Sequence, residues 1–148
     1  MTTTSIADER QIIERNLNLM KTLDDAWNAG PKSPLWETFR KRHTEDVTVY
    51  WPGSAPATKG RHNHDLEAVE FFNTFPDNHL VNNPYKILFG QGDYTCSVAD
   101  FSGTMKRPMK GADGRTIQPT NKKFHLEFAP LHTGARTARS WKKDCFTT

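Results

Sequence analysis

Residues 85–105, YKILFGQGDYTCSVADFSGTM, carry the strongest fold signal in this 148-residue chain. Two runs rich in strand-forming residues flank the turn-forming segment Gly90–Asp93, a pattern typical of a β-hairpin. The second run, from Tyr94 to Met105, is long enough to cross a whole sheet. We therefore predict an antiparallel sheet built around this hairpin.

The residues at the start of the chain, ahead of the hairpin, have the pattern of two helices. Ser5 can cap a helix with Asp8 three residues later, a variant of the capping box, and apolar residues then recur on one helical face. Gly30-Pro31 ends that pattern. Ser33 and Pro34 suit the N-cap and first residue of a short second helix.

A strand and a third helix are expected next. VTVYW, residues 47–51, alternates between two faces, with Tyr50 on the face opposite Trp51. Asn63 is a plausible cap for the third helix. The apolar residues of this helix that are spaced for burial are Leu66, Val69 and Phe72.

The segment KFHLEF, residues 123–128, predicts the last strand. Phe124 and Phe128 share one face with Leu126, while His125 and Glu127 share the other. After Phe128 the alternation ends. Helices at the front and antiparallel strands behind predict one α+β domain, with the helices covering one face of the sheet.

Composition and charge narrow the function classes. Residues 1–128 hold 16 Lys and Arg against 16 Asp and Glu, so the net charge of +3 arises in the last twenty residues. An electrically neutral domain argues against nucleic acid as a partner. Neither a membrane span nor a signal peptide is recognisable, which predicts a cytoplasmic protein without a membrane partner. Two cysteines support neither a disulfide framework nor a zinc cluster.

Several motifs occur in an order that resembles a known family. They are VTVYWPG, FFNTFPDNH, FSGTM and DGRTIQPTNKKFHLEF. Together they resemble the SnoaL-like polyketide cyclase and ester cyclase family, and the likeness covers residues 5–128. The resemblance implies a nuclear-transport-factor-2-like cone, in which a curved, mostly antiparallel sheet and three N-terminal helices enclose a small-molecule pocket.

The last residues lack the final strand pair that this family has. Read two nucleotides out of phase, the codons of Thr137 to Thr148 permit GQIVEEGLFYD, a family-like final strand. The Trp141-Lys142 junction forces Glu, and Asp144-Cys145 forces Leu. We therefore hypothesise a frameshift after Phe128, which leaves 129–148 as an irregular basic tail and residues 1–128 as a domain of marginal stability. A divergent or disordered terminus is the alternative.

The candidate site residues are polar or aromatic groups that could face the pocket. Trp51 could form an aromatic wall or simply pack in the core, and Tyr50 is the weaker ligand-binding candidate. His62 and His64 lie near the start of the third helix, where an imidazole could transfer protons or be merely solvated.

The other acid–base candidates lie at the ends of the sheet. Asp77 and His79 are spaced to share a strand face as a carboxylate–imidazole pair, although Asp77 could equally form a turn. Glu127 would be a buried carboxylate with a perturbed pKa if its face points inward. His62 to His64 offers two histidines but no third ligand, so we expect no metal, and no nucleotide-binding motif indicates a cofactor.

In characterised polyketide cyclases of this family the catalytic Asp lies on the final strand, so that residue cannot be transferred to this chain. The sequence therefore predicts a pocket protein acting by cofactor-independent acid–base chemistry on a small hydrophobic carbonyl or ester compound, and a possible homodimer. A non-catalytic ligand-binding or dimerisation domain is the alternative. Nucleic-acid binding through the basic tail is a third possibility.

Overall fold

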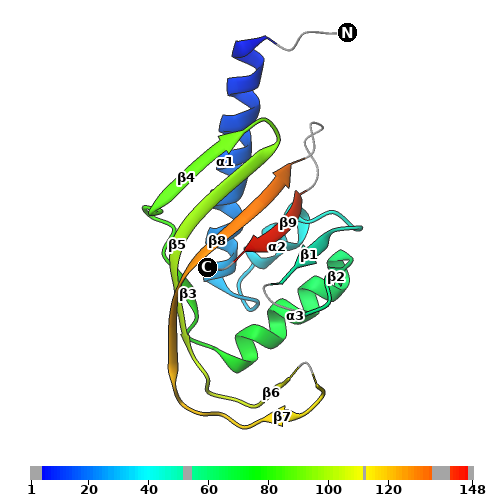
Figure 1. The fold of residues 1–148 in the computed structure, drawn as a ribbon, viewed down its shortest axis with the longest axis vertical. Coiled ribbons are helices and arrows are strands. Elements are labelled where there is room, and N and C mark those ends of the chain that lie inside the picture. The colour runs from blue at the N-terminus through cyan, green and yellow to red at the C-terminus, as the bar shows by residue number, and fades with distance from the viewer. Residues whose placement is uncertain (1–4, 52–54, 112, 135–140, 147–148) are drawn as a thin grey trace.

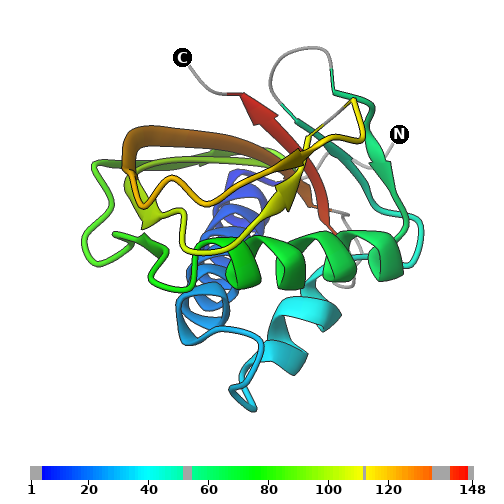
Figure 2. The same ribbon diagram turned by 90° about the horizontal axis from the view of Figure 1, so that it is seen from below.

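The computed structural model describes residues 5–51, 55–111, 113–134 and 141–146. Three helices lie against one face of a curved sheet, and a small strand pair extends from one end of the sheet (Figure 1). Figure 2 shows the three helices gathered on the same side of the sheet. The predicted α+β architecture is confirmed.

The three helices are α1 (Ile6–Ala29), α2 (Trp36–Arg42) and α3 (Arg61–Thr74). The predicted capping box at the start of α1 is present. The amide of Asp8 donates to the Ser5 hydroxyl at 3.2 Å, and the Ser5 amide donates to the Asp8 carboxylate at 3.3 Å. Two amides that the first turn would leave unsatisfied are thereby paired.

The starts of α2 and α3 differ from the sequence prediction. The helix α2 begins two residues after Pro34, and α3 begins directly after Gly60, ahead of the expected cap Asn63. Leu66 is exposed, whereas His64 and Ala68 are buried. Phe72 packs against the core as predicted, but the fully buried residues of α3 are His64, Ala68 and Thr74 rather than Leu66 and Val69.

One sheet contains seven strands, in the order β2-β1-β9-β8-β5-β3, and β4 also pairs with β5. The strands are β1 (Thr48–Tyr50), β2 (Thr58–Lys59), β3 (His79–Leu80), β4 (Ile87–Gln91), β5 (Tyr94–Thr104), β8 (Lys123–Gly134) and β9 (Trp141–Phe146). A second sheet pairs β6 (Met109–Lys110) with β7 (Thr116–Ile117). Within the described residues, β1 pairs with β9 in parallel, and the other strand pairs are antiparallel.

The expected hairpin is formed by β4 and β5, whose two-residue turn is Gly92-Asp93. Gly92 has a φ of 56°, a conformation that glycine adopts without the steric cost of a Cβ. As predicted, β5 is long, and it pairs with β4 and β3 on one side and β8 on the other.

The C-terminal residues differ most from the sequence expectation. Instead of ending at Phe128, β8 continues to Gly134, and residues 141–146 of the expected irregular tail form β9 between β8 and β1. Main-chain groups on both neighbours pair with β9, and such hydrogen bonds do not depend on an alternating side-chain pattern. The frameshift itself stays a prediction.

Two buried clusters join the helices to the sheet, and Trp27 of α1 contacts both of them. Its ring centroid lies 6.1 Å from that of Trp36 in the first cluster and 6.3 Å from that of Phe101 in the second. On β8, Phe124, Leu126 and Phe128 pack against the second cluster, as their shared face predicted. The core therefore lies between the sheet and the helices.

Candidate functional site

A largely apolar cavity lies between the helices and the sheet. Its lining residues are Leu23, Asp24, Trp27, Phe39, Trp51, Phe71, Leu80, Phe101 and Phe128. The cavity measures about 50 Å³. Because one water molecule needs about 10–15 Å³ on such a measure, this space holds about three to five waters. It fits a small chemical group.

Asp24 supplies the carboxylate of this otherwise apolar lining. It lies on α1, and only 8% of its surface is exposed. The hydroxyl of Tyr85, 61 residues further along the chain, donates a 2.7 Å hydrogen bond to Oδ2 of Asp24. The segment between β3 and β4 thus places a hydrogen-bond donor, the Tyr85 hydroxyl, against the helix α1.

The protonation state of Tyr85 supports this arrangement. Burial raises the pKa of the Tyr85 hydroxyl far above its ordinary value, and the nearby negative charge of Asp24 raises it further. A phenol in such surroundings stays protonated, so it remains a donor to the carboxylate. Tyr85 also lines an outer groove together with Lys21 and Asp25.

Trp51 is held in the cavity wall by a chain of polar contacts. Its indole Nε1 donates to the Thr58 hydroxyl at 3.0 Å, and that hydroxyl donates to Oε1 of Glu67 at 2.6 Å. Oε2 of Glu67 lies 3.8 Å from Nδ1 of His64. Although burial opposes it, hydrogen bonding from His64 and Thr58 lowers the pKa of Glu67.

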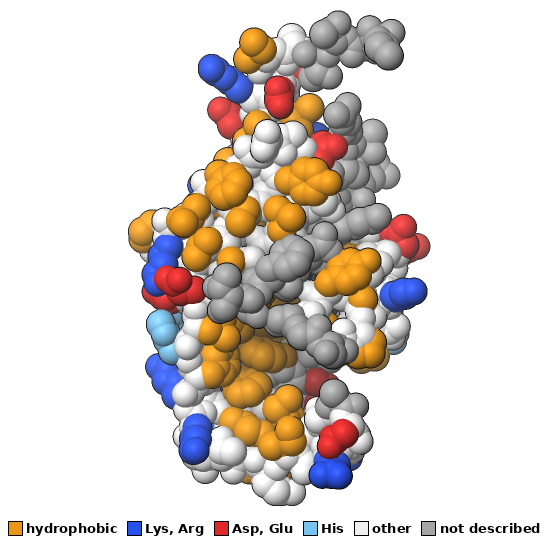
Figure 3. Space-filling view, in the orientation of Figure 1, with side chains coloured by type: hydrophobic (Ala, Val, Ile, Leu, Met, Phe, Trp, Pro, Cys, Tyr) orange, Lys and Arg blue, Asp and Glu red, His pale blue; other side chains and the backbone are white. Residues whose placement is uncertain are grey.

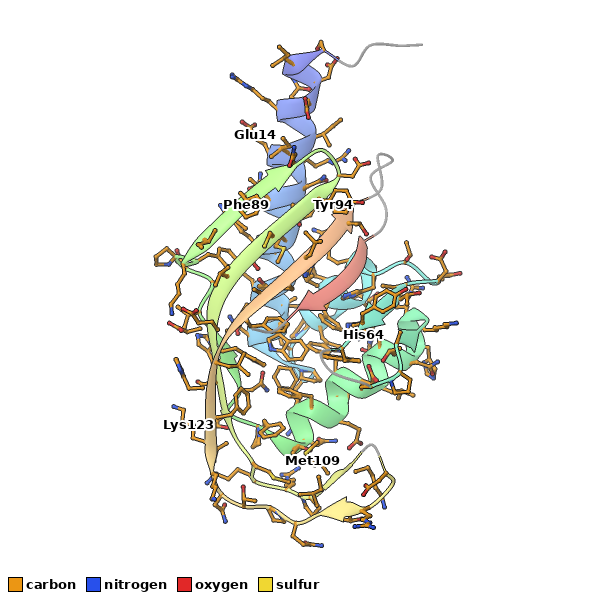
Figure 4. All side chains as sticks on the ribbon, in the orientation of Figure 1. Glu14, His64, Phe89, Tyr94, Met109 and Lys123 are labelled. Atoms are coloured by element: carbon orange, nitrogen blue, oxygen red, sulfur yellow. The ribbon has the colours of Figure 1, made fainter. Side chains whose placement is uncertain are left out.

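His64 is fully buried but does not line the cavity. Its ring lies 4.7 Å from that of His43, 5.5 Å from that of Phe39 and 6.3 Å from that of Trp51, measured between centroids. Figure 4 shows His64 directed from α3 into the interior of the domain. The imidazole therefore lies behind two residues of the cavity wall.

Asp77 and His79 lie at the surface, outside the lining of the cavity. The Asp77 carboxylate accepts hydrogen bonds from the amide and the hydroxyl of Thr104, both at 2.7 Å. His79 begins β3 and pairs with Ser102 of β5. Asp77 thus closes the junction between α3 and the end of β5 through a contact with a distant residue.

Glu127 and Tyr50 also lie away from the cavity. Glu127 accepts from Nζ of Lys86 at 2.6 Å, and the same amine lies 2.7 Å from Asp100. This ion-pair group is on the outer face of the sheet. Glu127 therefore does not point inward and is not buried. Tyr50 is 54% exposed, on the face opposite the buried Val49.

Asp24 and Tyr85 are the site residues that sequence reasoning missed. An acidic residue in an amphipathic helix usually faces solvent, and its partner lies far away in the sequence. One signal was available, because Asp24 follows the apolar positions Met20 and Leu23 at helical spacing and so lies beside the buried stripe. Among the described residues, no group of three or more His, Cys, Asp or Glu is arranged to hold a metal ion.

Solved structures with the same fold extend over most of the chain. A protein of Jannaschia sp. CCS1, assigned as a SnoaL-like polyketide cyclase, superposes with a TM-score of 0.74 at 18% identity, covering 99% of this chain and 91% of that one. A protein of Silicibacter sp. TM1040, assigned as a polyketide cyclase, gives 0.72 at 11% identity, covering 91% and 90%. AclR of Streptomyces galilaeus, assigned as a hydroxylase, gives 0.66 at 15% identity, covering 91% and 89%.

At these identities the structures share the fold, while their assigned activities differ. No curated protein matches the sequence. The model of the SnoaL-like polyketide cyclase family matches residues 18–132, which is more than half of the chain. The resemblance seen in the motifs is thereby confirmed, and this protein belongs to the SnoaL-like polyketide cyclase family.

Proposed function

We propose that this protein binds the reacting end of a small hydrophobic carbonyl or ester compound in its cavity and transfers a proton there without a cofactor. One observation carries the proposal: the buried Asp24 carboxylate lies in an otherwise apolar cavity wall and is oriented by Tyr85. A carboxylate held in an apolar wall can accept a proton from a compound bound against it.

The proposed step is the removal of a proton from the carbon next to a carbonyl. The C–H bond breaks, its electron pair moves onto the carbonyl to give an enolate, and Asp24 takes the proton. In a compound with a second carbonyl, the enolate carbon can attack that carbonyl carbon and close a ring. The second C=O bond then opens to an alkoxide, which takes the proton back from Asp24. This is the aldol chemistry that membership of a cyclase family favours.

The size of the cavity limits which part of the compound reacts there. About three to five waters occupy the same volume as a short ketone or ester group, whereas drug-sized ligands need pockets of roughly 300–1,000 Å³. We therefore propose that the reacting carbonyl end enters the cavity. The remainder of a larger compound would extend outside it.

The experiment measures proton transfer without requiring the natural substrate. Small carbonyl compounds, from acetone to methyl acetoacetate, are incubated with the protein in D₂O, and exchange of the proton next to the carbonyl is followed by NMR. We expect the protein to accelerate exchange and Asp24→Asn to lower that acceleration by about 10²–10⁴-fold, the usual contribution of a general base. Unchanged exchange in Asp24→Asn contradicts the proposal.

Two variants make the result specific. Asp25→Asn removes the same charge from the adjacent residue, whose carboxylate instead accepts from Asn82, and should leave exchange unchanged. If His64→Gln abolishes exchange while Asp24→Asn does not, the base is the imidazole expected from the sequence. Binding of a carbonyl compound with no acceleration of exchange would favour the non-catalytic alternative.

A further inference from the structure

Within residues 1–128, positive charge is concentrated in residues 105–123, which we call the basic arm. The arm holds six Lys and Arg against one Asp, whereas residues 1–103 hold ten Lys and Arg against fourteen Asp and Glu. The neutral average over residues 1–128 thus conceals two regions of opposite charge. A separation of this kind orients a protein in an electric field.

The arm links β5 to β8 and contains the strand pair β6–β7. It lies at one end of the molecule, and the N-terminus of α1 lies at the other (Figure 1). The six basic residues are all exposed; they are Lys106, Arg107, Lys110, Arg115, Lys122 and Lys123. In Figure 4 the labelled Lys123 lies at the outer edge of this end of the sheet.

The arm also exposes aliphatic side chains among its cations. Met109 is 36% exposed and Ile117 is 44% exposed. Pro108 is exposed between Arg107 and Met109. The arm contains no Phe, Trp or Tyr, so it offers no ring on which a nucleic-acid base could stack.

We propose that the basic arm docks on the surface of an anionic lipid bilayer. Clustered Lys and Arg are attracted to the negative surface potential of such a membrane, and exposed aliphatic side chains can enter its interfacial region. The more acidic remainder of the domain is repelled, so the arm faces the membrane. This contact is with the surface, since no helix within the described ranges is long and apolar enough to cross a bilayer. The earlier expectation of no membrane partner was based on spanning segments.

The test uses the full chain and vesicles of phosphatidylcholine with or without 30% phosphatidylserine. We expect sedimentation with the anionic vesicles, little with the neutral ones, and release in high salt, because exposed charges are screened. One cation near an anionic surface changes partitioning about fivefold, so Arg107→Gln with Lys122→Gln should weaken it by about 25-fold.

The matched control, Arg10→Gln with Lys41→Gln, removes two exposed charges outside the arm and should sediment as the wild type does. Thermal unfolding of both double variants shows whether either change disturbs the fold. Equal sedimentation of the two variants, or none at low salt, overturns the proposal. Tighter binding to an oligonucleotide than to the anionic vesicles overturns it in favour of nucleic acid. The readout does not depend on proton transfer at Asp24.

Discussion

The hydroxyl of Tyr85 lies 2.7 Å from Oδ2 of Asp24 and joins the β3–β4 connection to the first helix. This contact places a donor and a carboxylate together at the boundary between the cavity and the outer groove. Tyr85→Phe removes the donor and keeps the ring. We expect this change to lower the free energy of unfolding by about 1–3 kcal/mol, the range for breaking a buried hydrogen bond to a charged group. Urea titration measures it.

The same contact predicts how stability changes in alkali. The folded pKa of Tyr85 is raised above the value of about 10 that an unfolded tyrosine has, so ionisation is disfavoured in the folded protein. The contribution of Tyr85 is complete below about pH 10 and is lost as the pH rises further. Urea midpoints from pH 8 to 11 should fall more steeply for the wild type than for Tyr85→Phe. Parallel curves would contradict this explanation.

The hydrogen bonds to Asp77 predict that the stability of the fold decreases at acid pH. Hydrogen bonds from the Thr104 hydroxyl and then its amide lower the pKa of Asp77, so the ionised form stabilises the fold. Its contribution is present above the unfolded pKa of about 4 and is lost as the pH falls below it. We expect Asp77→Asn to be less stable than the wild type at pH 7, by at most about 1 kcal/mol because the site is exposed, and nearly equal to it near pH 2. A difference that does not depend on pH would mean that the charge is unimportant.

The outer face of the β4–β5 hairpin predicts a homodimer. Ile87, Phe89 and Tyr94 are each more than half exposed there, and hydrophobic side chains gather over these strands in Figure 3. Figure 4 labels Phe89 and Tyr94 on this face. We propose that a second copy of the chain covers this patch, and we expect Phe89→Ser to shift sedimentation velocity from dimer to monomer.

Gln91→Ser, a polar change on the same strand, should leave the dimer intact and serves as the control. A wild-type protein that stays monomeric at high micromolar concentration would rule out this interface.

The position of β9 indicates how thermal stability should change if the hypothesised reading frame is restored. In the sheet β9 lies between β8 and β1, with Lys143 opposite Val49 and Asp144 opposite Leu131. A strand flanked on both sides usually carries apolar residues. Replacing Thr137 to Thr148 with GQIVEEGLFYD should therefore raise the thermal midpoint by several degrees.

Sequencing the gene across this region tests the origin of the tail directly. An unaltered midpoint in the replacement, with a gene sequence that matches the chain, would remove the support for a frameshift.

Local sequence patterns predicted much of the fold. The capping box at Ser5, the hairpin before Tyr94 and the shared face of Phe124 and Phe128 all depend on neighbouring residues, and all are present. The strand β9 could not be predicted from its own residues. Its position follows from pairing with β1 and β8, which are distant in the sequence.

The site was less predictable than the fold. The role of Trp51 in the wall could be predicted, because strand alternation assigns the face on which its side chain lies, and Trp51 does line the cavity. The orientation of Glu127 could not be predicted. The alternation of residues along a strand separates its two faces but does not say which face meets the helices. Asp24 gains its environment from Tyr85 and from rings on several other elements, so its role depends on tertiary contacts that no local pattern records.

The position of β9 also sets the order in which the protein can fold. The strands β1 and β2 are made early, and β8 and β5 are made later, yet β9 at the end of the chain stands between the two groups in the sheet. During synthesis the two parts of the sheet therefore cannot join through β9 until residues 141–146 have left the ribosome. Until then β1 and β8 each present an open edge, and such an edge can pair with other chains.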